Sequence, residues 1–262
     1  MDALLDVRPL ETIKGEANRI YQRRMAELLD KLQVLAGTNL GLAKSLWQVA
    51  SGNMLGLRGL LAGAAREFAA LRGPAELPTV LVVGEIYVRS NAFANDSVVE
   101  RLEARGMRVK LASCGEFIEY IDHVNRHDHG RNGLNARIGT AAQERIRSVV
   151  HRVMTRELGG HARTPIAATM AAAKDYVPES LECEAILTVG AALHHWRAGE
   201  IDAVVNIGPL ECMPTKVAEA QFFHIAQREG LPSLTLSLNG DSINTETLDN
   251  FAFEVHERFR NS

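Results

Sequence analysis

The stretch from Ile201 to Pro214 reads IDAVVNIGPLECMP. Its first half is an apolar, β-branched run typical of a buried strand, and a helical pattern begins near Thr215. The residues between them are therefore predicted to form the loop at the carboxyl end of a parallel strand, where open α/β sheets bind their ligands. This loop carries one thiol, Cys212, close to a glycine and two prolines that restrict the backbone. We expect the helix-start amides beyond Pro214 to favour the thiolate form of Cys212.

Three further apolar runs predict strands, at 79–84, 107–112 and 232–238. Helical patterns separate or follow these runs, at 94–105, 184–197, 215–229 and 245–260. Alternation of strands and helices is typical of a mainly parallel, doubly wound sheet. The sequence therefore predicts an α/β fold.

The first third of the chain differs from the rest, because residues 8–71 show apolar residues at helical spacing and no strand-like run. A glycine at 37 marks a stop between helices. The segment 72–78 contains two prolines and a glycine, which end a helix and favour a linker. We expect a helical N-terminal region over 1–73 and an α/β domain over 78–262. The helical extension would either cover a sheet face or dock another chain.

Composition excludes several function classes. The chain has 262 residues, a formal net charge of −3 and a hydrophobic fraction of 46%, which describes a soluble protein with a sizeable core and gives no sign of nucleic-acid binding. No signal peptide or membrane-spanning run is visible, so a cytoplasmic location is expected. The three cysteines lie far apart in sequence, which argues against a disulfide framework.

The His-rich segment between His123 and His151 does not match the spacing of a helix-borne metal site. A polar turn between helices, over 127–133, is the interpretation that we prefer.

The loop after the first strand, 84–96, lacks both the dinucleotide-binding and the phosphate-binding glycine motifs. It is rich in polar side chains at a strand's carboxyl end, where a ligand crevice is expected. The alternative is that these side chains only cap helices and bond the loop itself. The predicted substrate-binding residues are Glu85, Tyr87, Arg89, Ser90, Asn91 and Asn95, with Asp96 beside them.

The cysteines suggest a metal centre. Cys114 follows the second strand as Cys212 follows the third predicted strand, so both thiols should lie at the same edge of a parallel sheet. Cys183 lies near the start of a helix and could reach that edge. Three thiolates from separate loops suit an iron–sulfur cluster better than structural zinc, whose ligands usually come as close Cys-x-x-Cys pairs. The alternative is three separate, half-buried thiols.

Three motifs carry a resemblance to a known family: VGEIYVRSNAFAN at 83–95, EAILTVG at 184–190 and GPLECMP at 208–214. In this order they resemble the carboxy-terminal part of the acyl-CoA dehydratase activase-related proteins, relatives of the 2-hydroxyacyl-CoA dehydratase and benzoyl-CoA reductase subunits. The resemblance extends from about Pro78 to Arg260 and leaves the helical first third unassigned.

The resemblance implies a flavodoxin-like domain, a [4Fe–4S] cluster and low-potential electron transfer coupled to acyl-CoA chemistry in anaerobes. In the dehydratase subunits one ligand cysteine follows the second strand and another follows a later strand, positions that Cys114 and Cys212 match; Cys183 would be a third ligand. The actin-like ATPase domain and the companion α/β domain of those systems are missing. The chain would then work beside a partner subunit or an ATP-dependent reductase, or as a homodimer with the cluster between its chains.

Two functions of different classes follow. The first is an iron–sulfur protein that relays an electron or presents an open iron to a small acyl substrate; if an acid or base is needed, Glu85 and Glu211 are the candidates nearest in sequence. The second is a metal-free binding or scaffold subunit that docks a larger complex. A thiol enzyme that uses Cys212 as nucleophile ranks lowest, because no histidine partner is apparent nearby. The sequence leaves open whether the chain itself is an enzyme.

Overall fold

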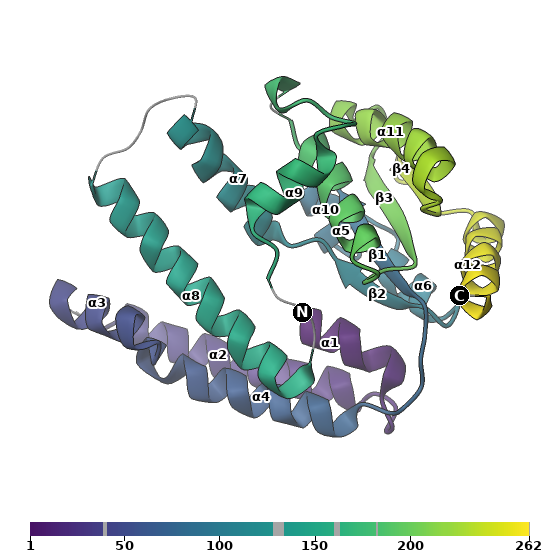
Figure 1. Ribbon diagram of the computed structural model, residues 1–262. Coiled ribbons are helices and arrows are strands. Elements are labelled where there is room, and N and C mark those ends of the chain that lie inside the picture. Colours follow the sequence, from purple (N-terminus) through teal and green to yellow (C-terminus); the bar gives the residue numbers. More distant parts are fainter. Residues whose placement is uncertain (39–40, 128–133, 160–162, 182, 262) are drawn as a thin grey trace. The chain divides into compact units, whose positions relative to one another are not determined.

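Figure 1 shows the computed structural model of the chain. The residues that it describes are 1–38, 41–127, 134–159, 163–181 and 183–261. Contacts divide the chain into two compact units. One comprises Met1–Ala75 and Asp122–Arg163, and the other comprises Glu76–Ile121 and Thr164–Ser262.

The second unit is built on a four-stranded sheet in the order β2-β1-β3-β4, and every strand pair in it is parallel. This order is that of a flavodoxin-like, doubly wound α/β fold. The expected fold class and the four expected strands are therefore confirmed. The strands are β1 (Thr79–Gly84), β2 (Arg108–Leu111), β3 (Ala203–Pro209) and β4 (Ser233–Leu238).

Strands β1 and β3 form the centre of the sheet. Every residue of β1 is buried, as is every residue of β3 before Pro209. Burial on both faces explains the continuous Val, Leu and Ile runs, since each side chain packs against a covering helix whichever way it points. Because all four strands are parallel, their carboxyl ends meet at one edge.

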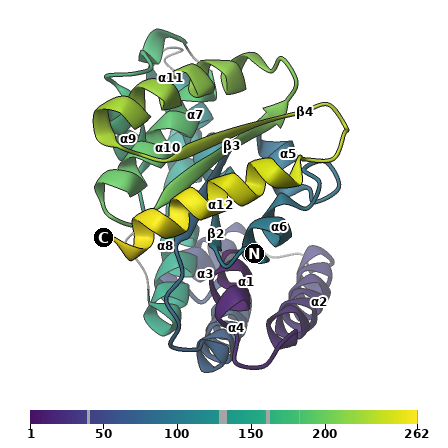
Figure 2. The ribbon, with the colours of Figure 1, turned by 90° about the vertical axis from the view of Figure 1, so that its right-hand side faces the viewer.

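Helices cover both faces of this sheet (Figure 2). On one face lie α6 (Val98–Glu103) and α12 (Thr245–Arg260), and the opposite face carries α10 (Ala185–Arg197) and α11 (Met213–Glu229). The chain just after α6 is tied to α12, because His256 Nε2 lies 2.8 Å from the Arg105 carbonyl oxygen and the Arg105 guanidinium lies 2.7 Å from a carboxylate oxygen of Asp249. This unit also contains α5 (Ile86–Ser90), α9 (Ile166–Ala173), the short η3 (Glu179–Leu181) and the first part of α7 (Cys114–His127).

The helix expected over 94–105 is shorter than the pattern suggested. Asp96 and Ser97 have φ values of 51° and 54°, so the chain turns there through left-handed backbone and α6 begins only at Val98. The expected helices over 184–197, 215–229 and 245–260 match α10, α11 and α12 to within two residues.

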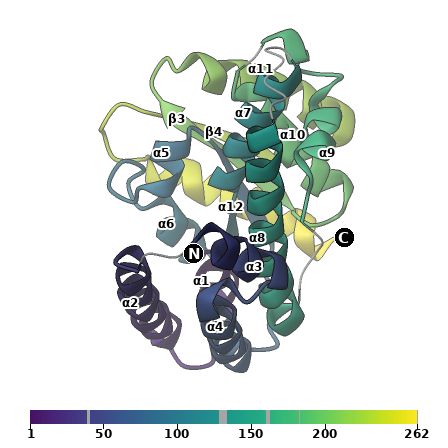
Figure 3. The ribbon, with the colours of Figure 1, turned by 90° about the vertical axis from the view of Figure 1, so that its left-hand side faces the viewer.

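The first unit is helical, and Figure 3 shows α4 between α2 and α8. Its core includes Leu4, Ile20 and Phe68, which pack together from three helices. Arg24 adds a two-pronged ion pair to Glu67, at 2.9 and 2.7 Å. The helices are α1 (Asp2–Val7), η1 (Arg8–Leu10), α2 (Glu16–Ala36), α3 (Leu42–Ser51), η2 (Met54–Gly56), α4 (Leu57–Leu71) and α8 (Leu134–Leu158).

The expected boundary near the 72–78 linker coincides with the junction between Ala75 and Glu76. The segment Asp122–Arg163, which the sequence pattern places within the α/β domain, groups instead with the N-terminal helices, because α8 packs on α4. Helix α7 (Cys114–His127) contains the second junction. Most of the predicted 127–133 turn lies outside the described residues.

Among the helices of the described residues, none combines the length and apolar character needed to cross a membrane.

Candidate binding site at the carboxyl edge of the sheet

Gly84 ends β1 and brings the chain against β3. Its φ of +104° is left-handed backbone, and a Cβ built there would lie 2.0 Å from the Ile207 carbonyl oxygen. The same oxygen accepts a hydrogen bond of 2.9 Å from the Glu85 amide. Only glycine fits this close approach, so Gly84 fixes where the following loop leaves the sheet.

Glu85, a predicted substrate-binding and catalytic candidate, caps the short helix α5. Its carboxylate accepts from the amides of Tyr87 and Val88, at 3.0 and 2.7 Å. These bonds satisfy helix-start donors that would otherwise have no partner in the helix. Capping α5 is a structural role that is sufficient to explain why a glutamate occupies position 85.

The two asparagines of the loop also bond to their own segment. Buried Asn95 donates to the carbonyls of Val88 and Arg89 and accepts from the Val98 amide, at 2.9, 3.3 and 3.2 Å. Asn91 bonds the Tyr87 hydroxyl through its amide nitrogen, at 3.0 Å. Its oxygen accepts from the backbone amides two and three residues later in the chain. These bonds hold the loop in one conformation.

Of the six predicted substrate-binding residues, Arg89 is the one that lines a pocket. The residue as a whole is only 7% exposed, and its Nη1 donates to the Gly84 carbonyl oxygen. The buried Nε has no hydrogen-bond acceptor among the described residues. Tyr87, by contrast, is 64% exposed, and the Ser90 hydroxyl lies 3.5 Å from the Cys114 sulfur.

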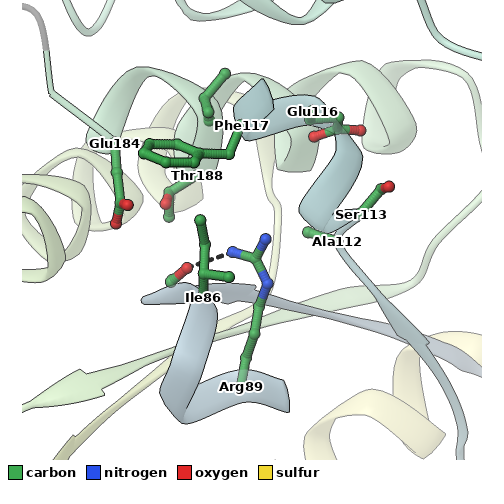
Figure 4. Close-up of a pocket in the computed structure, with 10 residues that line it drawn as sticks. Ile86, Arg89, Ala112, Ser113, Glu116, Phe117, Glu184 and Thr188 are labelled. Carbon is green, nitrogen blue, oxygen red and sulfur yellow. Dashed lines mark hydrogen bonds between the residues drawn. The ribbon is translucent and has the colours of Figure 1, made fainter. Parts of the chain in front are cut away.

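The pocket lies between the loop after β1, the segment after β2 and the start of α10 (Figure 4). Its walls combine apolar side chains with a similar number of charged or hydroxyl-bearing residues, and the space between them has room for about one water molecule. Figure 4 shows the Arg89 guanidinium rising into it, with Ser113 and Glu116 on one side and Glu184 on the other. The lining residues are Gly84, Ile86, Arg89, Ala112, Ser113, Glu116, Phe117, Glu184, Leu187 and Thr188.

Glu184 is half-buried at the start of α10. Burial raises the pKa of its carboxyl above the ordinary value, the nearby Glu85 carboxylate acts in the same direction, and Arg89 opposes both. Among the ion pairs of the described residues, none joins Arg89 to Glu184. The pocket therefore has a cation and a carboxyl on different walls that do not neutralise each other directly.

All three cysteines are free thiols. Cys114 is exposed at the first turn of α7, just after β2, and Cys212 is the N-cap residue of α11, just after β3. Cys183 precedes α10, next to the pocket residue Glu184. Strand β1 lies between β2 and β3, so Cys114 and Cys212 occupy the same edge on either side of β1.

Within the described part of the chain, no three His, Cys, Asp or Glu side chains are close enough together to hold a metal ion. The three thiols share an edge but are not assembled into one ligand group. Glu211, the other catalytic candidate, is exposed beside Cys212 in left-handed backbone, with a φ of 60°.

A second charged cluster lies away from the pocket. His195 Nδ1 lies 2.6 Å from a carboxylate oxygen of Glu200, and Lys110 Nζ lies 3.3 Å from the same oxygen. Burial, together with the Lys110 charge, lowers the pKa of His195 to about 4. His195 is thus neutral at pH 7 and holds its buried position through the contact with Glu200.

Sequence reasoning did not single out Ser113, Glu116, Phe117 or Thr188 as pocket residues. Ser113 follows a predicted strand and Thr188 lies in a predicted helix that crosses to the next strand, so topology alone could have suggested both. The side-chain direction of Phe117 had no signal in the sequence.

The fold and the site define a flavodoxin-like α/β protein with free thiols and a small charged pocket at the carboxyl edge of its sheet. When the chain is compared with family models, with curated proteins and with solved structures, none of the three comparisons gives a match.

Proposed function

We propose that this protein is an iron–sulfur protein that binds a [4Fe–4S] cluster at the carboxyl edge of the sheet. Cys114, Cys212 and Cys183 would supply the thiolate ligands. The cluster would carry one electron at low potential, or present an open iron to a small acyl substrate held by the loop after β1.

One observation carries this proposal: the three thiols of the chain all lie at or beside one edge of the sheet, around the end of β1. Loops that follow parallel strands meet at one edge of the sheet, so cysteines far apart in sequence are brought to the same side. The likeness of the three sequence motifs to acyl-CoA dehydratase activase-related proteins supports the same function.

The donor set fits the group chemically, because thiolates are the ligands of such clusters. The spacing adds a constraint. Strands β2 and β3 are two strand intervals apart, or roughly 9–10 Å, and no assembled three-ligand group is present in the described residues. The thiols of one chain are therefore too far apart to surround a cluster by themselves. If two copies of the chain each contribute thiols from this edge, a cluster can be bound between them without rearranging the sheet. We therefore favour a homodimer.

The protein's own residues would tune and protect such a centre. The Ser90 hydroxyl, 3.5 Å from Cys114 Sγ, would donate a hydrogen bond to a ligand sulfur and so raise its reduction potential. Glu85 and Glu211 stay candidates for proton transfer. A cytoplasmic location and a partner subunit or ATP-dependent reductase complete the proposal.

Cysteine variants test the proposal. The protein is prepared without oxygen, reconstituted with iron and sulfide, and followed by its visible absorption spectrum. We expect Cys114→Ser and Cys212→Ser each to abolish the absorption of the cluster, and Cys183→Ser to weaken it. Met213→Leu, an exposed sulfur-bearing neighbour of Cys212, is the matched control and should leave the spectrum unchanged. Equal spectra for all four variants would contradict cysteine ligation.

The second candidate is a metal-free scaffold subunit. Exposed apolar side chains on helices α2 and α3, among them Leu29, Val34 and Trp47, favour it, since large apolar residues gathered on exposed helices often mark a docking surface. A stably folded, iron-free protein that still binds a partner through these helices would support this candidate over the first.

A further inference from the structure

We propose that the outer edge of β4, the side that faces away from β3, pairs antiparallel with β4 of a second copy of the chain and joins the two sheets into one. This contact uses a different part of the α/β unit from the three thiols, and it does not depend on cluster binding.

The outer edge of β4 carries backbone groups that have no partner in the sheet. Strand β4 is the last in the strand order, and the carbonyl oxygens of Pro232 and Leu238 accept hydrogen bonds from amides of the β3 segment. Backbone groups of successive strand residues point to opposite sides, so Ser233, Thr235 and Ser237 direct their N–H and C=O groups outward. Among the described residues, no backbone hydrogen bond reaches these outward groups.

Strand β4 lacks the features that usually keep an edge strand from pairing. Its sequence, SLTLSL, contains no proline and no charged residue. At the other end of the sheet, β2 has only four residues, of which Arg108 and Lys110 are charged. Short length and charge both discourage pairing between edges, so β4 is the edge to which a further strand can be added. Figure 2 views the molecule from this side and shows β4 between α11 and α12.

A second copy of β4 is the strand that matches this edge. When two copies of β4 run antiparallel about a two-fold axis at Thr235, Ser233 of each copy lies opposite Ser237 of the other. Each outward N–H group then faces an outward C=O group, because residues opposite each other in such a ladder exchange both bonds. The edge is therefore self-complementary, as a two-fold contact requires.

Helix α11 adds a side-chain contact beside the strand. Lys216 lies near the end of β4, because its Nζ is 3.0 Å from Ser237 Oγ. Phe223 is two helical turns further along the same side of α11, about 10 Å toward the start of β4, and is 63% exposed. The opposite side of α11 carries Arg228, which lies over the Tyr176 ring. The two-fold pairing brings Phe223 of each copy next to Lys216 of the other, so the ring can cover the lysine stem and face its ammonium group.

The contact is large enough for a stable pair. A strand of six residues is about 20 Å long, and a sheet with a helix on each face is roughly 30 Å thick. Docking of two such edges buries about 600 Å² per copy, or about 1,200 Å² in all, which is the lower limit of specific, stable interfaces. Helix α11 packs on both β3 and β4, so its two copies would lie about 10 Å apart, the usual distance between packed helices.

This contact differs from the one proposed for the cluster. Antiparallel strands place the carboxyl edges of the two sheets at opposite ends, so the pair formed through β4 does not share a cluster. Pairing through β4 forms without iron, whereas a shared cluster requires it. If both contacts form, each chain has two different neighbours, and loading with iron and sulfide converts dimers into larger assemblies.

Sedimentation equilibrium of the iron-free full chain tests the proposal. At roughly 100 μM, the measured mass should be about twice the 28.7 kDa of one chain. Phe223→Lys places a like charge beside Lys216 of the second copy, so it should weaken dimerisation at least tenfold. Phe253→Lys is the same change at a residue that is 67% exposed on α12, away from the paired edge, and should leave dimerisation unchanged. A monomer at this concentration, or equal dimerisation of the parent and both variants, would overturn the proposal.

Amide hydrogen exchange identifies the surface through which the copies meet. The outward amides of Ser233, Thr235 and Ser237 should exchange slowly in the dimer, and at least tenfold faster in the Phe223→Lys variant under conditions where it is a monomer. A dimer in which these three amides exchange as fast as in the monomeric variant would refute pairing through β4. Both measurements use iron-free protein, so their outcome is separate from that of the cluster proposal.

Discussion

Replacing Gly84 by alanine should destabilise the α/β unit and dislodge the loop that carries Arg89. A Cβ at this position lies 2.0 Å from the Ile207 carbonyl oxygen and 2.7 Å from the Ile207 nitrogen, and both are backbone atoms that no side-chain rotation can move. The φ of +104° adds a conformational penalty of about 1 kcal/mol or more for alanine. Separation of β1 from β3 by an ångström or so would then cost roughly 3 kcal/mol in total.

Two other glycines separate these contributions. Gly199 has a φ of +68°, and no atom lies within 4 Å of the position that a Cβ would take, so Gly199→Ala should cost only about 1 kcal/mol. At Gly190, within α10, a Cβ would lie 2.1 Å from the Thr169 carbonyl oxygen, and the φ of Gly190 is not positive. Gly190→Ala therefore measures the cost of steric overlap alone. We expect the loss of stability to be largest for Gly84→Ala, close to it for Gly190→Ala and smallest for Gly199→Ala.

Urea unfolding followed by tryptophan fluorescence is the assay. The chain has two tryptophans, Trp47 in α3 and Trp196 in α10, so a Trp47→Phe background leaves a reporter in the α/β unit alone. In thermal unfolding, a loss of 3 kcal/mol corresponds to a fall in Tm of roughly 6–12 °C. If Gly84→Ala is no less stable than Gly199→Ala, the close approach of β1 to β3 is not as described, and the geometry of the Arg89 loop loses its basis.

Further predictions concern pH, the loop and the thiols. The pKa of His195 is about 4 in the folded chain and has its ordinary value of 6.5 in the unfolded chain. Between pH 6.5 and pH 4 the unfolded chain therefore binds a proton at His195 that the folded chain does not bind. The contribution of His195 to the free energy of unfolding should therefore be constant above pH 6.5. It should fall as the pH is lowered toward 4, by at most about 1.4 kcal/mol per pH unit. In urea titrations His195→Gln should reduce this slope, whereas the control variant of an exposed histidine, His224→Gln, should leave it unchanged. Asn95→Ala should lower the free energy of unfolding by about 2–4 kcal/mol, because Asn95 is only 2% exposed and three of its side-chain hydrogen bonds are lost. Asn91 is less buried, so Asn91→Ala should lower it by about 1 kcal/mol. Equal losses of stability in the two variants would contradict the difference in burial. Ser90→Ala should leave cluster loading intact and shift the reduction potential of the bound cluster, measured by redox titration, to a lower value, since a hydrogen bond to a ligand sulfur is removed; an unchanged potential would show that Ser90 does not contact the ligand.

The sheet was predictable from sequence because its signals are local. Buried parallel strands are typically built from continuous β-branched and apolar runs, and those at 79–84 and 201–207 have no competing helical period. The helix beginning at Val98 was placed too early because the turn at Asp96 and Ser97 uses left-handed backbone that non-glycine residues rarely adopt. The grouping of residues 122–163 with the N-terminal helices depends on which faces of α4 and α8 meet, and a single sequence does not encode that pairing in any local pattern.

The candidate site was predictable in position and less so in its residues. Its edge follows from topology, since loops after parallel strands share one side. For the polar side chains in the 84–96 loop the sequence left two roles open, facing a ligand or bonding the loop itself. Glu85, Asn91 and Asn95 satisfy backbone groups of the loop, as polar residues in turns often do. Arg89 is the member that enters the pocket. Its burial depends on the exit direction set by Gly84, which only the packed structure defines.

The proposal that the carboxyl edge of the sheet holds a cysteine-ligated cluster is tested most directly by the iron and acid-labile sulfide content of the protein prepared without oxygen. A cluster shared between two chains predicts about four irons and four sulfides per homodimer, lost together when Cys114 or Cys212 is replaced. Iron and sulfide near zero in a folded protein, with the cysteine variants indistinguishable from the parent, would contradict the proposal and leave the metal-free subunit as the function to pursue.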